Sequence, residues 1–224
     1  MKRQYIIAAV MLSGAAGVSA QTPREWRDSL SVVNRQIETS PYSSDLHLRK
    51  AAINLELLQW QYAVDEYGLV LGRDPANPAA LFYRAYANTH LRRYDLARND
   101  YEEFLKIVPR NMEALLGLAH IYTKLQRSTD AMDRMNRLVE LFPDSAVAYA
   151  ARAGLETELK AHDAALYDWA EACRLDPGNT DFILSKADLL IRMGRKKDAR
   201  TELDRAVGKG VPRGALNEWY RKCK

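Results

Sequence analysis

The chain has 224 residues, of which 47% are hydrophobic and 28% are charged, with 33 Lys and Arg against 29 Asp and Glu. This composition is typical of a folded globular protein and argues against intrinsic disorder. The nearly balanced charge, formally +4, disfavours a nucleic-acid-binding protein, and only two cysteines exclude a disulfide-stapled scaffold.

The first twenty residues predict an export signal. Two basic residues open the chain, an apolar run extends from Tyr5 to about Val18, and small residues follow up to Ala20. We therefore expect residues 1–20 to be a cleaved signal peptide of a periplasmic or secreted protein, with a retained N-terminal anchor as the alternative. The absence of a cysteine near the cleavage point disfavours a lipoprotein, and no segment of the mature chain is apolar enough to span a membrane.

A period of 34 residues runs through the rest of the chain. It divides the sequence into five units, 44–77, 78–111, 112–145, 146–179 and 180–213. Alanine occupies the eighth and twentieth positions of every unit, as expected where two helices cross closely. Proline stands at position 32 of the first four units and should end the second helix. We expect polar caps to start the next unit: Asn77, Asn111, Ser145 and Asn179 or Thr180.

Each unit is therefore predicted to be a helix, a turn, a second helix and a second turn. This pattern resembles the tetratricopeptide repeat family, whose 34-residue unit carries Ala at these two positions, a large residue at position 24 and Pro at position 32. The resemblance implies an all-α fold, a right-handed α-α solenoid of about five and a half repeats. Val211 replaces the proline in the fifth unit, which makes the end of that unit less regular.

Partial units are expected to close both ends. Residues 21–43 contain a helical apolar stripe that includes Trp26, and residues 214–224 contain another that includes Trp219. We interpret both tryptophans as cap packing, because each repeat buries its apolar face only against a neighbour. Cys173 is expected in the core and Cys223 on the last helix, too far apart for a disulfide.

Position 7 departs from the leucine that the family prefers. It is basic in four units, and position 23 is acidic in the same four. The third unit has Leu118 and Arg134 at these places instead. We expect a structural ladder of ion pairs between the two helices of each unit, with two unrelated solvated charges as the alternative. The expected pairs are Lys50–Glu66, Arg84–Asp100, Arg152–Asp168 and Lys186–Glu202.

No catalytic or metal-binding motif occurs, and no cofactor is expected. By resemblance, the first helices of the repeats line a concave binding face. On these helices the second and third units concentrate aromatic and basic residues, whose alternative role is packing between helices. The candidate residues are Phe82, Tyr83, Tyr86, His90, His120 and Lys124.

The sequence therefore predicts a non-catalytic scaffold that binds a peptide or partner protein through this concave face. Two alternatives remain: a structural subunit of a cell-envelope or secretion assembly, bound through its ends or convex face, and an accessory domain of a cell-wall enzyme. The Lys and Asn pair with which related domains hold the acidic tails of cytosolic chaperones is absent from positions 5 and 9 of every unit. The sequence does not indicate the partner or the oligomeric state.

Overall fold

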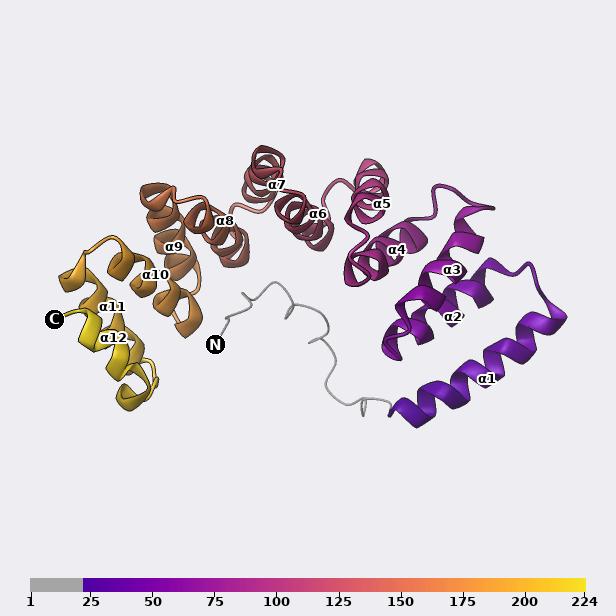
Figure 1. Ribbon diagram of the computed structural model, residues 1–224, viewed down its shortest axis with the longest axis horizontal. Coiled ribbons are helices and arrows are strands. Elements are labelled where there is room, and N and C mark those ends of the chain that lie inside the picture. Colours follow the sequence, from indigo (N-terminus) through magenta and orange to yellow (C-terminus); the bar gives the residue numbers. More distant parts are fainter. Residues whose placement is uncertain (1–21) are drawn as a thin grey trace. The chain divides into compact units, whose positions relative to one another are not determined.

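The computed structural model describes residues 22–224, which form helices and no strand (Figure 1). The predicted signal peptide lies outside the described residues. Two compact units divide at Arg127 and Ser128. Unit 1 contains α1 (Pro23–Thr39), α2 (Ser44–Glu56), α3 (Trp60–Leu71), α4 (Pro78–His90), α5 (Tyr94–Ile107) and α6 (Met112–Lys124). Unit 2 contains α7 (Ser128–Leu141), α8 (Ala146–Glu158), α9 (His162–Leu175), α10 (Thr180–Arg192), α11 (Lys196–Gly208), the 3₁₀ helix η1 (Arg213–Leu216) and α12 (Asn217–Lys222).

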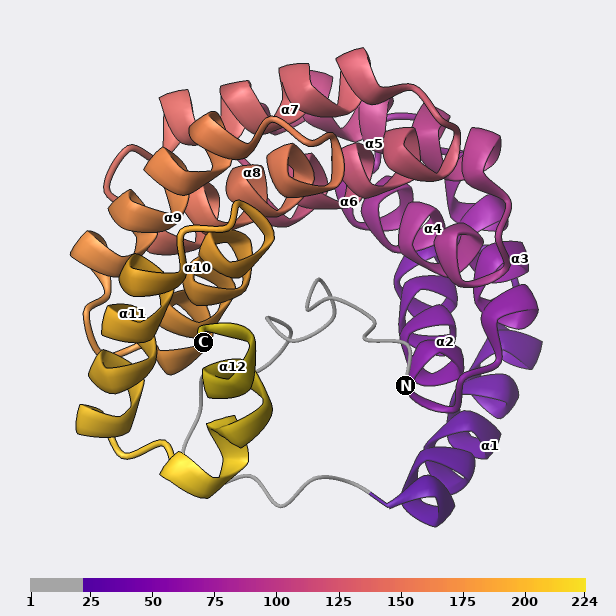
Figure 2. The ribbon, with the colours of Figure 1, turned by 60° about the vertical axis from the view of Figure 1, so that its left-hand side comes forward.

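Within each unit, consecutive helices pack against each other as hairpins. In unit 1, Figure 2 shows α2 and α4 along one side and α3 and α5 along the other. We call these sides the first-helix face, which also includes α6, and the second-helix face. The predicted all-α repeat architecture is confirmed, and the ten alanines at positions 8 and 20 are at most 1% exposed.

Polar caps start the first helices as predicted. The side chains of Asn77, Asn111, Ser145 and Asn179 accept hydrogen bonds from backbone N–H groups in the first turns of α4, α6, α8 and α10. Proline ends the second helix less directly than expected. Helices α5, α7 and α9 stop two residues before it, whereas α3 stops at Leu71, four residues before Pro75. Gly72 follows Leu71 directly, and glycine favours helix termination.

The four predicted ion pairs join the two helices of their hairpins. Arg84 and Arg152 each bind an aspartate with two nitrogens, at 2.9 and 2.7 Å for Asp100 and at 2.5 and 2.9 Å for Asp168. The lysine pairs, Lys50–Glu66 and Lys186–Glu202, are 2.6 and 2.7 Å long. Because the acidic side chains are only 1–13% exposed, the pairs are structural elements of the hairpins.

Glu66 has a second partner that the sequence pattern did not indicate. Nδ1 of the buried His47 lies 2.6 Å from a Glu66 oxygen, and its Nε2 lies 3.0 Å from the carbonyl oxygen of Pro41. Both ring nitrogens of His47 are thus within hydrogen-bond distance of an oxygen atom. This histidine therefore ties the turn before α2 to α3.

The C-terminal cap is shorter than one full helix. It consists of η1 and α12, and its Trp219 packs against the core of α9, α10 and α11 as predicted. Cys173 is buried in that core and Cys223 packs against the same cluster, although the sequence interpretation placed the two cysteines apart. The cap folds back on the fifth repeat, which explains their common location. Both thiols are free.

The turn between the helices of each repeat contains one residue with positive φ. Four of these residues are not glycine, whereas the fifth repeat has Gly194 at φ 73°. We expect Gly194→Ala to lower the free energy of unfolding by about 1 kcal/mol, because a Cβ is strained in this conformation. No atom lies within 4 Å of the added Cβ, so the effect would come from the backbone alone.

Equilibrium urea denaturation measures this effect, and Gly208→Ala is the matched control. Gly208 also has open space around it, but it ends α11 with an ordinary φ. That substitution should be neutral or slightly stabilising. Equal effects of the two substitutions would contradict the strain at residue 194.

Candidate functional site

Three aromatic rings meet on the first-helix face of unit 1. Trp60, the first residue of α3, stacks on His90, the last residue of α4, with ring centroids 4.0 Å apart and planes at 3°. Tyr86, one turn before His90, meets both rings edge-on at centroid distances of 5.9 and 4.6 Å. We call these three residues the aromatic cluster. Such rings offer a large contact area with little side-chain entropy to lose.

The aromatic cluster is uncharged at neutral pH. Burial lowers the pKa of His90, so its imidazole is neutral. Burial also raises the pKa of the Tyr86 hydroxyl, and the nearby carboxylate of Glu56 raises it further. The cluster therefore combines apolar ring faces with polar atoms that can donate or accept hydrogen bonds.

The residues predicted for the concave face do not form one group in the structure. Phe82 packs against Tyr101 and Phe104 of α5 at centroid distances of 5.6 and 5.2 Å, so it contributes to the packing between α4 and α5. Tyr83 is 43% exposed, but its ring stacks on Tyr67 of α3 at 6.1 Å. These two aromatic residues belong chiefly to the packing of their helices.

Helix α6 carries the other two candidates. His120 is half-buried and Lys124 is exposed one turn later. Burial lowers the pKa of His120, and the Lys124 charge lowers it further. No interaction described in residues 22–224 joins either side chain directly to the aromatic cluster.

Tyr101 of α5 lies between the aromatic cluster and the two candidates on α6, His120 and Lys124. Its phenol packs against the backbone of Gly117, where a Cβ would come within 3.0 Å of the ring. Burial raises the pKa of Tyr101, and so does the neighbouring Tyr86 phenol. Tyr101 thus links Tyr86 on α4 with the turn of α6 that precedes His120.

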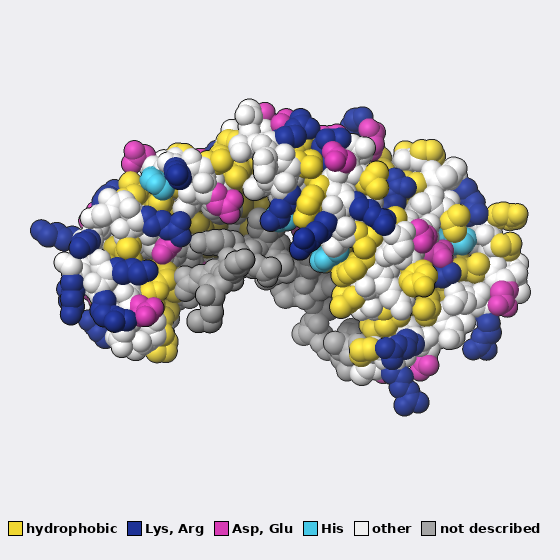
Figure 3. Space-filling model, in the orientation of Figure 1, with side chains coloured by type: hydrophobic (Ala, Val, Ile, Leu, Met, Phe, Trp, Pro, Cys, Tyr) yellow, Lys and Arg dark blue, Asp and Glu magenta, His cyan; other side chains and the backbone are white. Residues whose placement is uncertain are grey.

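Sequence reasoning missed Trp60 as a member of this surface, whereas Tyr101, only 3% exposed, has the packing role expected of position 24. Trp60 occupies position 17 of its repeat, where the next repeat also has an aromatic residue, Tyr94. An aromatic residue at the start of a second helix was the available signal. Hydrophobic side chains are frequent over the part of Figure 3 where α2 to α4 lie in Figure 1.

The described residues contain no group of three or more His, Cys, Asp or Glu side chains placed to hold a metal ion. None of the helices in residues 22–224 combines the length and the apolar character needed to cross a bilayer.

Two tetratricopeptide repeat models match the chain, over residues 55–111 and residues 89–155. Solved tetratricopeptide repeat proteins have the same fold over most of the chain. Residues 55–155 belong to the tetratricopeptide repeat family. No curated protein sequence matches it. Among the tetratricopeptide repeat (TPR) structures, MamA has a TM-score of 0.67 and 18% identity, covering 74% of this chain and 91% of MamA.

YrrB, described as a TPR protein with an unusual peptide-binding site, has a TM-score of 0.63 and 19% identity, covering 80% of this chain and 92% of YrrB. A TPR protein from Parabacteroides merdae has a TM-score of 0.61 and 17% identity, covering 89% of this chain and 78% of that protein. At these identities the likeness concerns the fold. The TPR fold is that of a protein-interaction scaffold, and TPR proteins are generally not enzymes.

Proposed function

We propose that this TPR protein is exported and binds a peptide or partner protein through the first-helix face of unit 1. The aromatic cluster carries the proposal, because Trp60, Tyr86 and His90 present adjoining rings without a charge that would need a counter-ion. His120 and Lys124 add a neutral imidazole and a cation on α6. Affinity would come from aromatic contact on a preformed surface.

Capture of the native partner tests this proposal. The tagged chain is purified from the native cell envelope, and proteins that co-purify are quantified by mass spectrometry. We expect Tyr86→Ala to reduce recovery of the partner at least about tenfold, as for a central aromatic contact. Helical circular dichroism and the melting temperature verify that the variant is folded.

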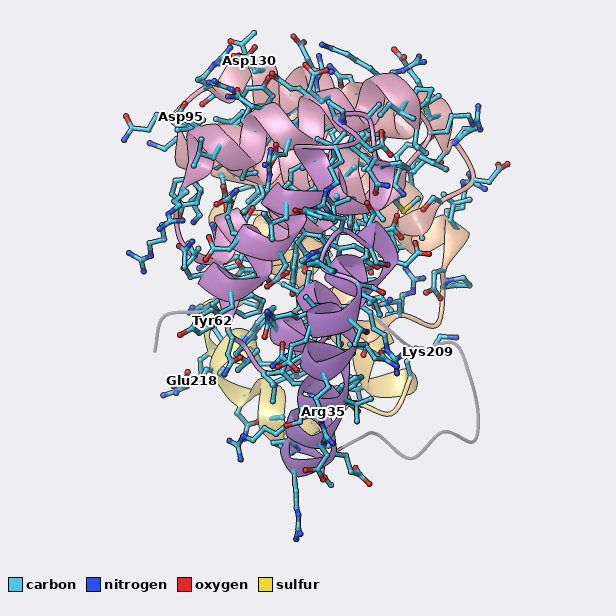
Figure 4. The ribbon with its side chains drawn as sticks, turned by 90° about the vertical axis from the view of Figure 1, so that its right-hand side faces the viewer. Arg35, Tyr62, Asp95, Asp130, Lys209 and Glu218 are labelled. Atoms are coloured by element: carbon cyan, nitrogen blue, oxygen red, sulfur yellow. The ribbon has the colours of Figure 1, made fainter. Side chains whose placement is uncertain are left out.

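Tyr62→Ala is the matched control. Tyr62 is 64% exposed on α3, and Figure 4 shows it pointing outward on the same side as Asp95 of α5. This variant should recover the partner as well as the unmodified chain. Loss of recovery with Tyr62→Ala, together with full recovery by Tyr86→Ala, would contradict binding at the first-helix face.

The second candidate function is a structural subunit of an envelope or secretion assembly. Large exposed apolar side chains on α3 and α5 favour it: Tyr62 (64%), Leu69 (48%) and Leu96 (53%). In that case a stable complex would survive Tyr86→Ala and would dissociate when these three residues are replaced.

A further inference from the structure

A groove of about 410 Å³ lies on the second-helix face of unit 1, between α3 and α5. It lies on the opposite side of α4 from Tyr86, because Arg84 is two residues away, about 200° around the helix. Its lining residues are Gly68, Leu71, Gly72, Pro75, Leu81, Arg84, Asn99, Asp100 and Glu103.

Residues at position 25 of the repeat line two such grooves. Glu102 at this position accepts a hydrogen bond from the Tyr122 hydroxyl, and Asp204 accepts one from Tyr220 at 2.6 Å. Where the residue is small, the space is empty: Gly68 lines the groove in unit 1, and Ala170 lines a groove of about 510 Å³ in unit 2.

The chain itself does not require a glycine at residue 68. A Cβ built there meets no atom within 4 Å, and the residue lies inside α3, where glycine disfavours the helix. The opening is therefore not a by-product of close helix packing.

The groove exposes an unused hydrogen-bond donor of Arg84. Its Nε and Nη2 donate to Asp100, whereas its Nη1 has no partner among the described residues. The side chain is 28% exposed and forms part of the groove wall. The guanidinium can therefore donate one more hydrogen bond to a group that enters the groove.

Unit 2 contains an equivalent arginine and aspartate pair, in which Nη1 of the arginine already donates a hydrogen bond. Arg152 holds Asp168 through Nε and Nη2, as Arg84 holds Asp100, and its Nη1 donates to Oδ1 of Asn136 at 3.2 Å. Asn136 is at position 25 of its repeat, the position of Gly68 in the first. The side-chain oxygen of Asn136 thus occupies the place beside Arg152 that is empty beside Arg84.

We propose that the groove between α3 and α5 binds an asparagine or glutamine side chain of a protein partner, with the amide oxygen accepting from Nη1 of Arg84. A neutral amide fits better than an anion, because Asp100 already neutralises Arg84 and Glu103 at the groove is already paired with Lys106. Asn99 accepts from Arg98 through Oδ1, so its Nδ2 is available as a second donor. This surface is separate from the aromatic cluster.

Blocked pentapeptides test the proposal on the full chain: Ac-Ala-Ala-Asn-Ala-Ala-NH₂ and its counterparts with Asp or Leu at the centre. Titration followed by ¹H–¹⁵N NMR reports the backbone amides of the groove glycines and the Nε–H of Arg84. We expect saturable shifts at these signals with the Asn peptide and much weaker binding of the other two. Tighter binding of the Asp peptide, equal binding of the Leu peptide, or no saturable shift with the Asn peptide would overturn the proposal.

Two substitutions at one residue provide the control. Gly68→Asn supplies the missing amide from the chain itself, as Asn136 does, and should weaken peptide binding at least about tenfold through loss of one charged hydrogen bond. Gly68→Ala leaves most of the groove open and should bind the peptide within about threefold of the unmodified chain. Both should melt at or above the temperature of the unmodified chain, because asparagine and alanine are both better helix formers than glycine. Equal affinities of the two variants would overturn the assignment.

Discussion

Replacing Asp168 by alanine is expected to lower the free energy of unfolding by about 3–5 kcal/mol. The Asp168 side chain is 1% exposed and accepts two hydrogen bonds from Arg152, at 2.5 and 2.9 Å. Its loss would leave the guanidinium, which is itself only 20% exposed, without its counter-ion. Since domains are typically stable by about 5–15 kcal/mol, the substitution should remove a large part of the stability of unit 2. Urea denaturation followed by helical circular dichroism measures the change.

A double-mutant cycle measures the coupling free energy between Arg152 and Asp168 apart from their contacts with other residues. Arg152→Met removes the cation, and the double variant Arg152→Met/Asp168→Ala should be more stable than the Asp168→Ala variant, because no buried charge remains unpaired. The exposed pair Lys106–Glu103, at 68% and 57% exposure, is the control and should show a coupling below about 1 kcal/mol. A coupling near zero for Arg152 and Asp168 would show that the buried pair contributes nothing specific.

The repeat pattern predicts local structure well, because each position of a unit has one local environment. Alanines at positions 8 and 20 are buried, and the four asparagine or serine caps start helices where expected. The ion pairs could also be predicted, since positions 7 and 23 belong to the same hairpin and their charges vary together. In the third repeat, Leu118 is 1% exposed, and Nε of Arg134 on α7 is buried without a hydrogen bond.

Contacts between repeats were not predictable in the same way. Trp60 of the first repeat stacks on His90 of the second, and this pairing depends on the register between neighbouring hairpins. Phe82 is a second example: its position suggested a concave face, and its large ring also contacts Phe104 on the other helix of its hairpin. The repeat pattern therefore predicts where the helices begin and end. It does not predict which neighbours a large aromatic ring contacts, because that depends on the size of the ring and on the packing of adjacent hairpins.

Glu156 is the second residue for which we expect a large effect. It is 8% exposed, and its Oε2 has no hydrogen-bond partner. Burial raises its pKa from 4.5 to about 7, and the charge of Asp168 and a hydrogen bond to it act in the same direction, whereas Arg152 opposes them. Below pH 4.5 this carboxyl is protonated in both the folded and the unfolded chain. Between pH 4.5 and about 7 the unfolded chain has lost this proton while the folded chain still holds it, so the stability that Glu156 contributes falls over this range and is gone above it.

Glu156→Gln keeps the shape of this side chain and removes its ionisation. The variant should gain stability relative to the unmodified chain as the pH rises from about 5 to about 8.5, by up to about 3 kcal/mol at the alkaline end. Other titrating groups, including His90 and His120, are present in both proteins, so their contributions cancel in the difference. Urea denaturation of both proteins across this pH range measures it. A difference in stability that did not change with pH would mean that Glu156 is already ionised at pH 5, and that Arg152 outweighs the burial of its carboxyl group.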